Sequence, residues 1–300
     1  MAIYDQAMVR AVLALLAALA MAAPPGPSAA RILQDHRSAP GDLEIGGELA
    51  GLPHGTTRYI RYQDLLNLPQ EKYTISDDTN FHGKFHGKTQ IEGVPLEALA
   101  RLLGDAPNDA MIVAICYDHY RSNYPRDYLA AHRPLLVLRI NGQARDHWPP
   151  SEYGDSMQPY LISHPTFRPA FTILSHEDEP QIPYGVTRLE IRRESVVFGA
   201  ICPHGEWPAN SPVEQGYAIA RQDCFRCHNM GAEGGTLAGR SWLKLAAIAN
   251  HDPARFHQII HDPVSVTPGA KMPAHKDYDD ATLNALTAYF KTFASLRSKP

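Results

Sequence analysis

The stretch Cys224-Phe225-Arg226-Cys227-His228 decides how the C-terminal third of this 300-residue chain is built. Two cysteines three residues apart lie on one face of a helical turn, so both thiols can reach the same edge of a porphyrin. The histidine that follows can turn its imidazole towards the iron. A C-x-x-C-H pentad is the signature of covalent c-type haem attachment. We therefore expect Cys224 and Cys227 to hold one haem c and His228 to bind its iron.

Two other interpretations of the pentad stand beside haem attachment. A redox-active C-x-x-C followed by an incidental histidine is one, and half of a zinc site is the other. A structural zinc site needs four ligands, and no second C-x-x-C or Cys/His pair of suitable spacing follows the pentad. Haem attachment is therefore the interpretation that the sequence favours.

A sixth iron ligand is expected on the loop Pro268-Gly269-Ala270-Lys271-Met272-Pro273. Met272 lies between two predicted helices, and a loop rich in Pro and Gly can lay its thioether over the porphyrin. Met230 is too close to His228 to reach the opposite face. A Met/His pair favours ferrous iron and raises the potential, which suits electron transfer. Other candidate ligands are His251, His257, His261 and His275.

Helices surround this site in the predicted C-terminal domain. Residues 213–223 precede the pentad without a proline, and a middle helix and a shorter one are expected around Trp242–Ile248 and Phe256–Ile260. Asp279 is a good N-cap for a last helix that runs to about Ser295, with an apolar stripe at three- and four-residue steps. Fewer than 90 residues make a small core, to which a buried haem would add apolar surface.

Residues from about 211 to 293 resemble a class I c-type cytochrome domain. The resemblance rests on Gly216-Tyr217, the pentad, the glycine-rich turn 231–239, Met272-Pro273 and the segment Leu286-Thr287-Ala288-Tyr289-Phe290. It implies an all-α domain in which Cys224 and Cys227 carry the haem while His228 and Met272 ligate the iron.

Short strands separated by turns predict a β-rich α+β domain before the cytochrome-like region. The expected strands are residues 43–46, 111–116, 135–140 and 186–191, and a leucine-rich helix over residues 96–103 should end at Gly104. Asn141-Gly142 is a favoured hairpin turn dipeptide. The chain has no glycine-rich phosphate loop and no G-x-S-x-G, so common nucleotide and hydrolase sites are not expected.

This β-rich region resembles the molybdopterin-binding domain of the sulfite oxidase family. The matching segments are Gly93-Val94-Pro95-Leu96, Cys116-Tyr117-Asp118-His119-Tyr120 with Tyr128-Leu129, residues 135–143, and the strand 186–193. The resemblance also implies that Asp118, His119, Arg121 and Arg126 line a pocket. Alternatively, these four are ordinary polar residues on the protein surface.

One departure from that family counts against a molybdenum site. The family holds molybdenum through a cysteine thiolate before the Gly-Val-Pro-Leu segment, but residues 71–93 contain no cysteine. Ser76, Asp77 or Asp78 stands in that place. Cys116 comes after the helix, within a strand, and is a poor substitute. We do not expect molybdopterin, and interpret the domain as a metal-free docking module.

The N-terminus predicts export. Arg10 is followed by an apolar run over residues 11–23 and then by small residues and prolines, the pattern of a secretory signal peptide. An uncleaved membrane anchor is the alternative. In an oxidising compartment Cys116 and Cys202 could pair as a disulfide, or remain two free thiols.

The predicted organisation is a signal peptide over 1–30, a sulfite-oxidase-like domain over 31–201, a proline-rich linker over 202–212 and a cytochrome c domain over 213–297. The net charge of −4 argues against a nucleic-acid binder. We expect a periplasmic haem c electron-transfer protein whose partner is a redox protein such as a periplasmic dehydrogenase or oxidase. A molybdopterin-dependent oxidoreductase that passes electrons to its own haem is the alternative, and a haem sensor or assembly factor is a third.

Overall fold

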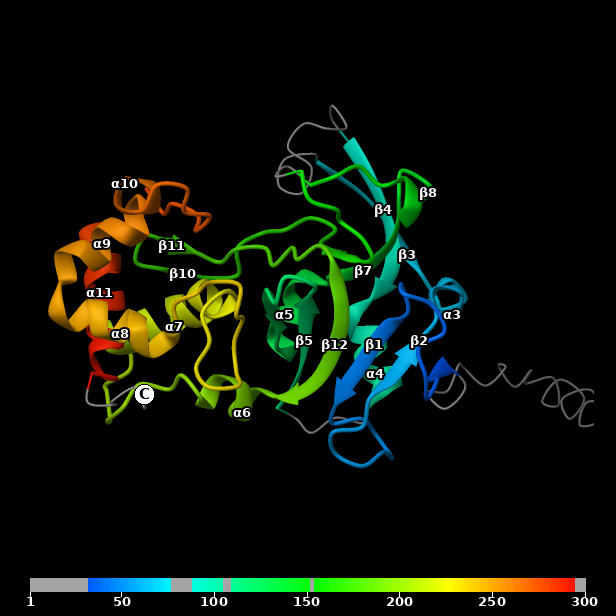
Figure 1. Cartoon of the computed structure of the whole chain (residues 1–300), viewed down its shortest axis with the longest axis horizontal. Helices are drawn as coiled ribbons and strands as arrows, with labels where there is room; N and C mark the ends of the chain where they lie inside the picture. Colours follow the sequence, from blue (N-terminus) through cyan, green and yellow to red (C-terminus); the bar gives the residue numbers. More distant parts are fainter. Residues whose placement is uncertain (1–31, 77–87, 105–108, 152–153, 295–300) are drawn as a thin grey trace, which may run out of the picture.

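The computed structural model describes residues 32–76, 88–104, 109–151 and 154–294. The predicted signal peptide, Asp77 and Asp78 lie outside the described residues. Figure 1 shows a β-rich domain joined to a helical domain, with the chain passing from one to the other near α6 (Glu194–Gly199). Among the described helices, none has the length and apolar character required to cross a membrane.

Two sheets build the β-rich domain. The first has the strand order β2-β1-β12-β5-β6, in which only β1 and β12 run parallel. Its strands are β1 (Leu43–Gly47), β2 (Arg58–Ile60), β5 (Ala110–Cys116), β6 (Arg121–Tyr124) and β12 (Val186–Arg193). The second has the order β3-β4-β7-β8, with β9 also paired to β7; these strands are β3 (Glu71–Ser76), β4 (Lys88–Pro95), β7 (Leu135–Ile140), β8 (Gln143–Ala144) and β9 (Leu161–Ser163).

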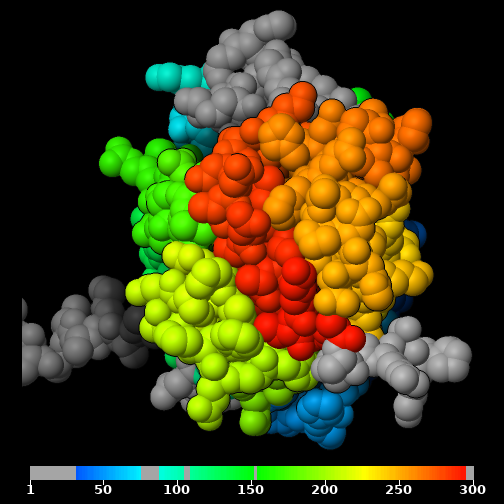
Figure 2. All heavy atoms as spheres, turned by 90° about the vertical axis from the view of Figure 1, so that its left-hand side faces the viewer, coloured from blue at the N-terminus to red at the C-terminus, as the bar shows by residue number. Residues whose placement is uncertain are grey.

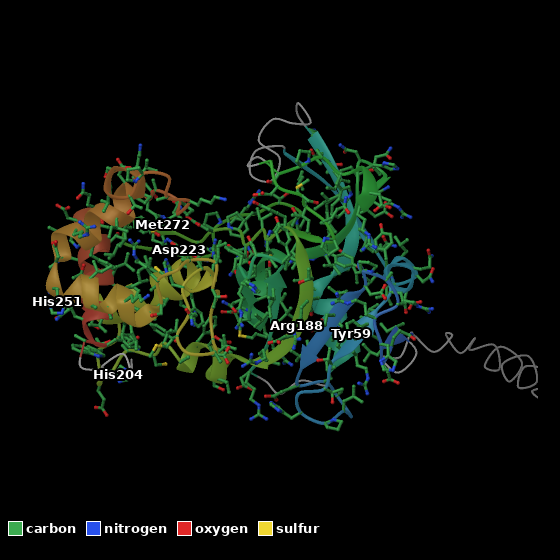
Figure 3. All side chains as sticks on the ribbon, in the orientation of Figure 1. Tyr59, Arg188, His204, Asp223, His251 and Met272 are labelled. Carbon is green, nitrogen blue, oxygen red and sulfur yellow. The ribbon has the colours of Figure 1, made fainter. Side chains whose placement is uncertain are left out.

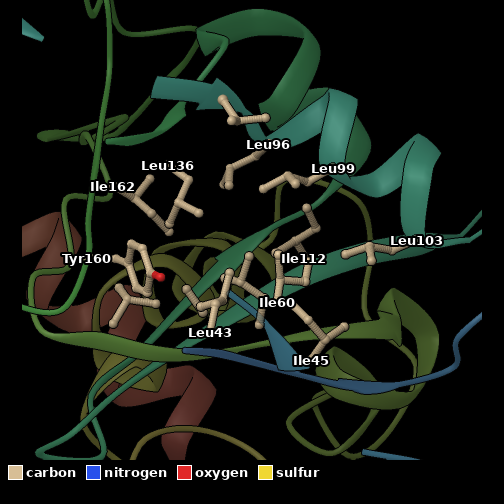
Figure 4. Close-up of a cluster of buried hydrophobic side chains, with 14 of the residues drawn as sticks. Leu43, Ile45, Ile60, Leu96, Leu99, Leu103, Ile112, Leu136, Tyr160 and Ile162 are labelled. Carbon is tan, nitrogen blue, oxygen red and sulfur yellow. The ribbon is translucent and has the colours of Figure 1, made fainter. Parts of the chain in front are cut away.

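Short helices complete the core of this domain. They are α3 (Tyr62–Leu66), α4 (Leu96–Leu103) and α5 (Arg126–His132). Figure 4 shows the leucines of α4 pointing towards side chains of β1 and β5. Leu96, Leu99, Leu43 and Ile45 are completely buried there. Continuous apolar sequence in β5 follows from burial on both faces, because alternate residues contact this core and the helical domain.

The helical domain is α7 (Pro212–Gln222), the single turn η2 (Cys224–Arg226), α8 (Trp242–His251), α9 (Pro253–His261), α10 (Pro263–Val266) and α11 (Asp280–Lys291). The side chain of Ser211 caps α7 by accepting from Glu214 N, and Asp279 caps α11 by accepting from Thr282 N. Figure 2 shows α11 in red along the middle of the outer face, beside the orange helices.

Helices α7 and α11 cross at unusually close range. A Cβ atom on Gly216 would lie 2.1 Å from the carbonyl oxygen of Ala285 and 2.8 Å from Cβ of Tyr289. Glycine is therefore required in mid-helix, in spite of its low helix propensity. This crossing places the pentad, which follows α7, and the loop that precedes α11 around one core.

The apolar core of the helical domain extends into the β-rich domain. Met111 and Val113 of β5, together with Val197 and Phe198 of α6, pack in the same cluster as Phe225. A further strand pair, β10 (Thr172–Ile173) and β11 (His176–Glu177), brings Ser175 within 2.7 Å of Thr282, measured between the two hydroxyl oxygens. The two domains thus meet across a packed seam.

The expected elements are confirmed with small differences. The β-rich domain is followed by a helical one, and the strands, the α4 helix and the Asp279 cap lie where predicted. Asn141 and Gly142 both have positive φ, at 50° and 77°, as the turn between β7 and β8 requires. The last helix ends at Lys291, whereas the apolar stripe predicted an end near Ser295.

We predict that Gly216→Ala destabilises the haem-loaded protein by about 1–3 kcal/mol, because the added methyl would force α7 and α11 apart. Urea unfolding followed by circular dichroism measures this. Gly199→Ala is the matched control, since that helical glycine has open space where its Cβ would lie. Equal stabilities of the two variants would contradict the close crossing.

Candidate functional site

The pentad forms one tight turn at the end of α7. Cys227 N donates to Cys224 O over 3.2 Å, and His228 N donates to the same oxygen over 2.9 Å. These bonds wrap the backbone into a helical turn, so the thiols of Cys224 and Cys227 share a side. The turn therefore has the arrangement that attachment to one porphyrin edge requires.

Both pentad thiols are protonated at neutral pH. Burial raises the pKa of Cys227 to about 11, an effect that Arg226 partly opposes. Burial also raises the pKa of Cys224, and the neighbouring carboxylate of Asp223 raises it further. Neither cysteine is therefore set up as the reactive thiolate of a redox C-x-x-C, in which the pKa is lowered.

His228 has the orientation and protonation of an iron ligand. Its Nδ1 lies 2.6 Å from the carbonyl oxygen of Arg240, to which it donates. The lone pair of Nε2 is then available for a metal, as in most histidine ligands held by a backbone carbonyl. Burial lowers the pKa of His228, which favours the neutral imidazole that metals bind. The donors of this turn thus fit a c-type haem.

Met272 lies on the loop between α10 and α11. It is half-buried against the same apolar cluster that Cys224 and Met230 contact. Figure 3 places Met272 and Asp223 on the side of the helical domain nearer the β-rich domain. The predicted axial methionine and the pentad therefore border one core.

The other candidate ligands have different surroundings. His251 is exposed and lies at the outer edge of the helical domain in Figure 3, well away from Asp223. His257 Nε2 is 2.8 Å from Thr287 Oγ1, and His261 Nε2 is 3.1 Å from Lys276 O. His275 stacks on the ring of Tyr278 at 4.6 Å between centroids. Three of these histidines thus have partners within the helical domain.

Arg226, in the middle of the pentad, is a buried cation at the domain seam. Its side chain is 12% exposed and lies 3.4 Å from Asp223 and 3.8 Å from Glu179. Burial alone would lower its pKa, but Tyr120, Asp223 and Glu179 together raise it. The guanidinium therefore stays charged and joins the haem-attachment turn to two residues of the β-rich domain, Tyr120 and Glu179.

The turn between β5 and β6 packs against the glycine-rich turn that follows the pentad. Thr236 N donates to His119 O over 3.1 Å, and Arg121 Nη1 donates to Ala232 O over 3.1 Å. Arg192 pairs with Glu233 across the same seam. Asp118, His119 and Arg121 were expected to line a pocket, with Arg126, which begins α5. His119 and Arg121 contact the helical domain through these bonds, and none of the four lines either of two cavities found among the described residues.

A cavity of about 670 Å³ lies between the domains. Its described lining includes His164 and four carboxylates, and no lysine or arginine; the acidic residues are Glu177, Asp178, Glu179 and Asp277. Phosphate recognition in proteins relies on Arg, Lys and backbone N–H donors. Ser76, one of the three residues expected in place of the molybdenum-binding cysteine, ends β3, and the other two lie outside the described residues. The described residues that line this cavity therefore offer no cationic side chain to the phosphate of a pterin cofactor.

The remaining cysteines are free thiols. Cys116 is buried at the end of β5, and Cys202 is exposed with its Sγ 3.7 Å from the hydroxyl of Tyr217. The alternative of a Cys116–Cys202 disulfide is not formed, because Cys116 packs in the core of the β-rich domain.

Sequence reasoning missed a buried polar cluster at the seam. Ligand-type atoms of His176, Glu179 and Asp223 lie within 4.8 Å of one another, but the guanidinium of Arg226 faces both carboxylates. Tyr278 OH also contacts both His176 Nδ1 and Asp223 Oδ2. The cluster is therefore a hydrogen-bonded ionic network, and its members are too far apart in sequence to form a motif.

Residues 211–290 match the family model described as cytochrome c oxidase, cbb3-type, subunit III. No curated protein sequence matches the chain. Among solved structures, the sulfane dehydrogenase SoxCD from Paracoccus pantotrophus is similar at 16% identity and a TM-score of 0.32. That similarity covers 53% of this chain and 40% of the other, so the chain spans two fifths of its length. The C-terminal region of this protein is thus a cytochrome c domain, and it follows a β-rich domain.

Proposed function

We propose that the protein is an exported electron carrier with a single covalent haem. The observation that carries this is the 2.6 Å contact from His228 Nδ1 to Arg240 O, which leaves Nε2 for iron on the turn that presents both thiols. In this proposal Cys224 and Cys227 attach the haem, and His228 and Met272 are its axial ligands. The haem supplies one-electron chemistry between ferric and ferrous iron.

The β-rich domain serves in this proposal as a docking module. It contacts the pentad through Tyr120 and Glu179, both next to Arg226. It therefore holds the haem-attachment turn rigidly and offers its own outer surface to a redox partner, a periplasmic dehydrogenase or oxidase. The export pattern at residues 11–23 supports a periplasmic location, and an uncleaved signal would keep the protein at the membrane.

Replacing the pentad thiols should remove the covalent link. We expect the double variant Cys224→Ala/Cys227→Ala, matured in a host with a c-type haem assembly system, to release any pigment into acidified acetone. Haem staining of a denaturing gel measures the loss. Cys202→Ala is the control, since that thiol is exposed and outside the site, and it should stain like the parent. Staining of the double variant at the parent's level would rule out thioether attachment.

Removing the Met272 side chain should change the ligation of the iron and leave the covalent attachment of the haem intact. We expect Met272→Ala to retain haem staining, to lower the midpoint potential and to let imidazole or cyanide bind the iron, because loss of the soft ligand weakens the ferrous state. Redox titration and absorption spectra follow both effects. Met230→Ala is the matched control beside His228. An unchanged low-spin spectrum and potential in Met272→Ala would eliminate Met272 as a ligand.

A metal inventory separates the carrier from a molybdopterin enzyme. We expect iron at one equivalent and molybdenum below a tenth of an equivalent in protein purified from a host that makes the cofactor. This follows from the acidic cavity and from the lack of a cysteine in residues 71–93. Molybdenum stoichiometric with iron would support the enzyme instead.

A further inference from the structure

A continuous chain of hydrogen bonds crosses the domain seam and ends beside the haem-attachment turn. His132 Nε2 lies 2.9 Å from Asp178 Oδ2, Gln222 Nε2 donates to Asp178 Oδ1 over 2.5 Å, and His176 Nε2 lies 2.7 Å from Gln222 Oε1. Tyr278 OH is 2.8 Å from His176 Nδ1 and also contacts Asp223 Oδ2. Three of its contacts join the two domains, because His132, Asp178 and His176 are in the β-rich domain, and Gln222, Tyr278 and Asp223 are in the cytochrome c domain.

The orientation of the Gln222 amide is fixed by Asp178. That carboxylate accepts from Ala170 N and faces His132 through Oδ2, and it accepts from Gln222 through Oδ1. A flipped amide would place an oxygen against the carboxylate, with no hydrogen between them. Gln222 therefore presents its oxygen to His176, and His176 Nε2 must be the donor in that contact.

Counting hydrogens along the rest of the chain reveals a shortage. Three contacts follow one another: Gln222 Oε1 with His176 Nε2, His176 Nδ1 with the Tyr278 oxygen, and the Tyr278 oxygen with Asp223 Oδ2. A neutral imidazole carries one N–H, and a phenol carries one O–H. Burial raises the pKa of Tyr278, so the phenol stays protonated. Two hydrogens cannot serve three contacts, and an ionised Asp223 adds none.

We propose that His176, Tyr278 and Asp223 together bind one additional proton at the seam, and that this proton is taken up when the haem iron gains an electron. With the proton on His176, Nε2 donates to Gln222, Nδ1 donates to Tyr278, and Tyr278 donates to Asp223. With the proton on Asp223, its O–H donates to Tyr278, which donates in turn to Nδ1. Either arrangement supplies the third hydrogen.

The groups around this site hold its charge in balance. Asp223 faces Arg226 at 3.4 Å, and Arg226 faces Glu179 at 3.8 Å. The rings of His275 and Phe171 flank Tyr278 and His176 respectively, and Asp178 lies behind Gln222. Glu179 has a 42% exposed side chain and lines the cavity with Asp178. Water in the cavity is therefore the source of the proton.

Electrostatics links the proton to the haem. Asp223 directly precedes Cys224, the charge of Asp223 acts on the Cys224 sulfur, and Cys224 in turn lies close enough to act on Tyr278. One electron from a one-electron donor removes one positive charge at the iron, and one proton from water restores one positive charge at the seam. Each of the two events therefore favours the other. This inference rests on the proposed haem. The residues that it concerns are not ligands of the iron.

The test is the midpoint potential of the haem-loaded full chain, measured by spectroelectrochemistry from pH 5 to pH 9. If one proton accompanies one electron, the potential falls by about 59 mV per tenfold drop in proton concentration over part of this range. Tyr278→Phe removes a single oxygen, keeps the ring that stacks on His275, and breaks the chain. We expect its potential to vary less than a third as steeply with pH as the parent's.

Tyr217→Phe is the matched control, because its hydroxyl contacts Phe198 O and Cys202, outside the chain. It should retain the parent's slope. His176→Gln is a second chain-breaking variant in case Tyr278→Phe does not fold, and it should also flatten the profile. A parent potential independent of pH, or slopes in both chain-breaking variants equal to that of Tyr217→Phe, would overturn the inference. Colourless protein would instead defeat the proposed function.

Discussion

The close crossing of α7 and α11 at Gly216 is the constraint on which the helical domain depends. Only 2.1 Å separates Ala285 O from the place that a Cβ atom on Gly216 would occupy, so the two helices touch through their backbones. The pentad follows α7 within two residues, and the Met272 loop leads into α11. Bringing these helices together therefore brings the thiols, the imidazole and the thioether to a single core. Any residue larger than glycine would separate the segments that must enclose the haem.

The seam between the domains adds orientation to this arrangement. Apolar contacts from β5 and α6 bury surface against Phe225, but such contacts allow some sliding. The polar chain from His132 to Asp223 allows much less, because a buried donor or acceptor without a partner costs about 1–3 kcal/mol. Displacing one domain would break several of these contacts at once. Apolar packing thus stabilises the interface, and the hydrogen bonds fix one relative placement of the two domains.

How much the sequence could predict depends on how local each signal is. The pentad, the Asp279 cap and the Asn141-Gly142 turn all lie within a few residues, and the structure has the cap and the turn where they were expected. The polar chain joins residues 44 to 102 positions apart, so no spacing reveals it. His119 and Arg121 were assigned to a pocket by resemblance. A resemblance of one domain cannot show that a second domain packs on that turn.

Charge balance connects the seam to electron transfer. Arg226 brings one positive charge into the buried space next to the haem-attachment turn. Asp223 adds one negative charge there, and Glu179 adds a second from the edge of the cavity. Unbalanced charge is costly where water is scarce, and the additional proton makes the sum zero. A cation beside the turn favours ferrous iron, whereas carboxylates favour ferric iron. The position of that proton, and with it the domain interface, therefore determines which oxidation state the surroundings of the haem stabilise.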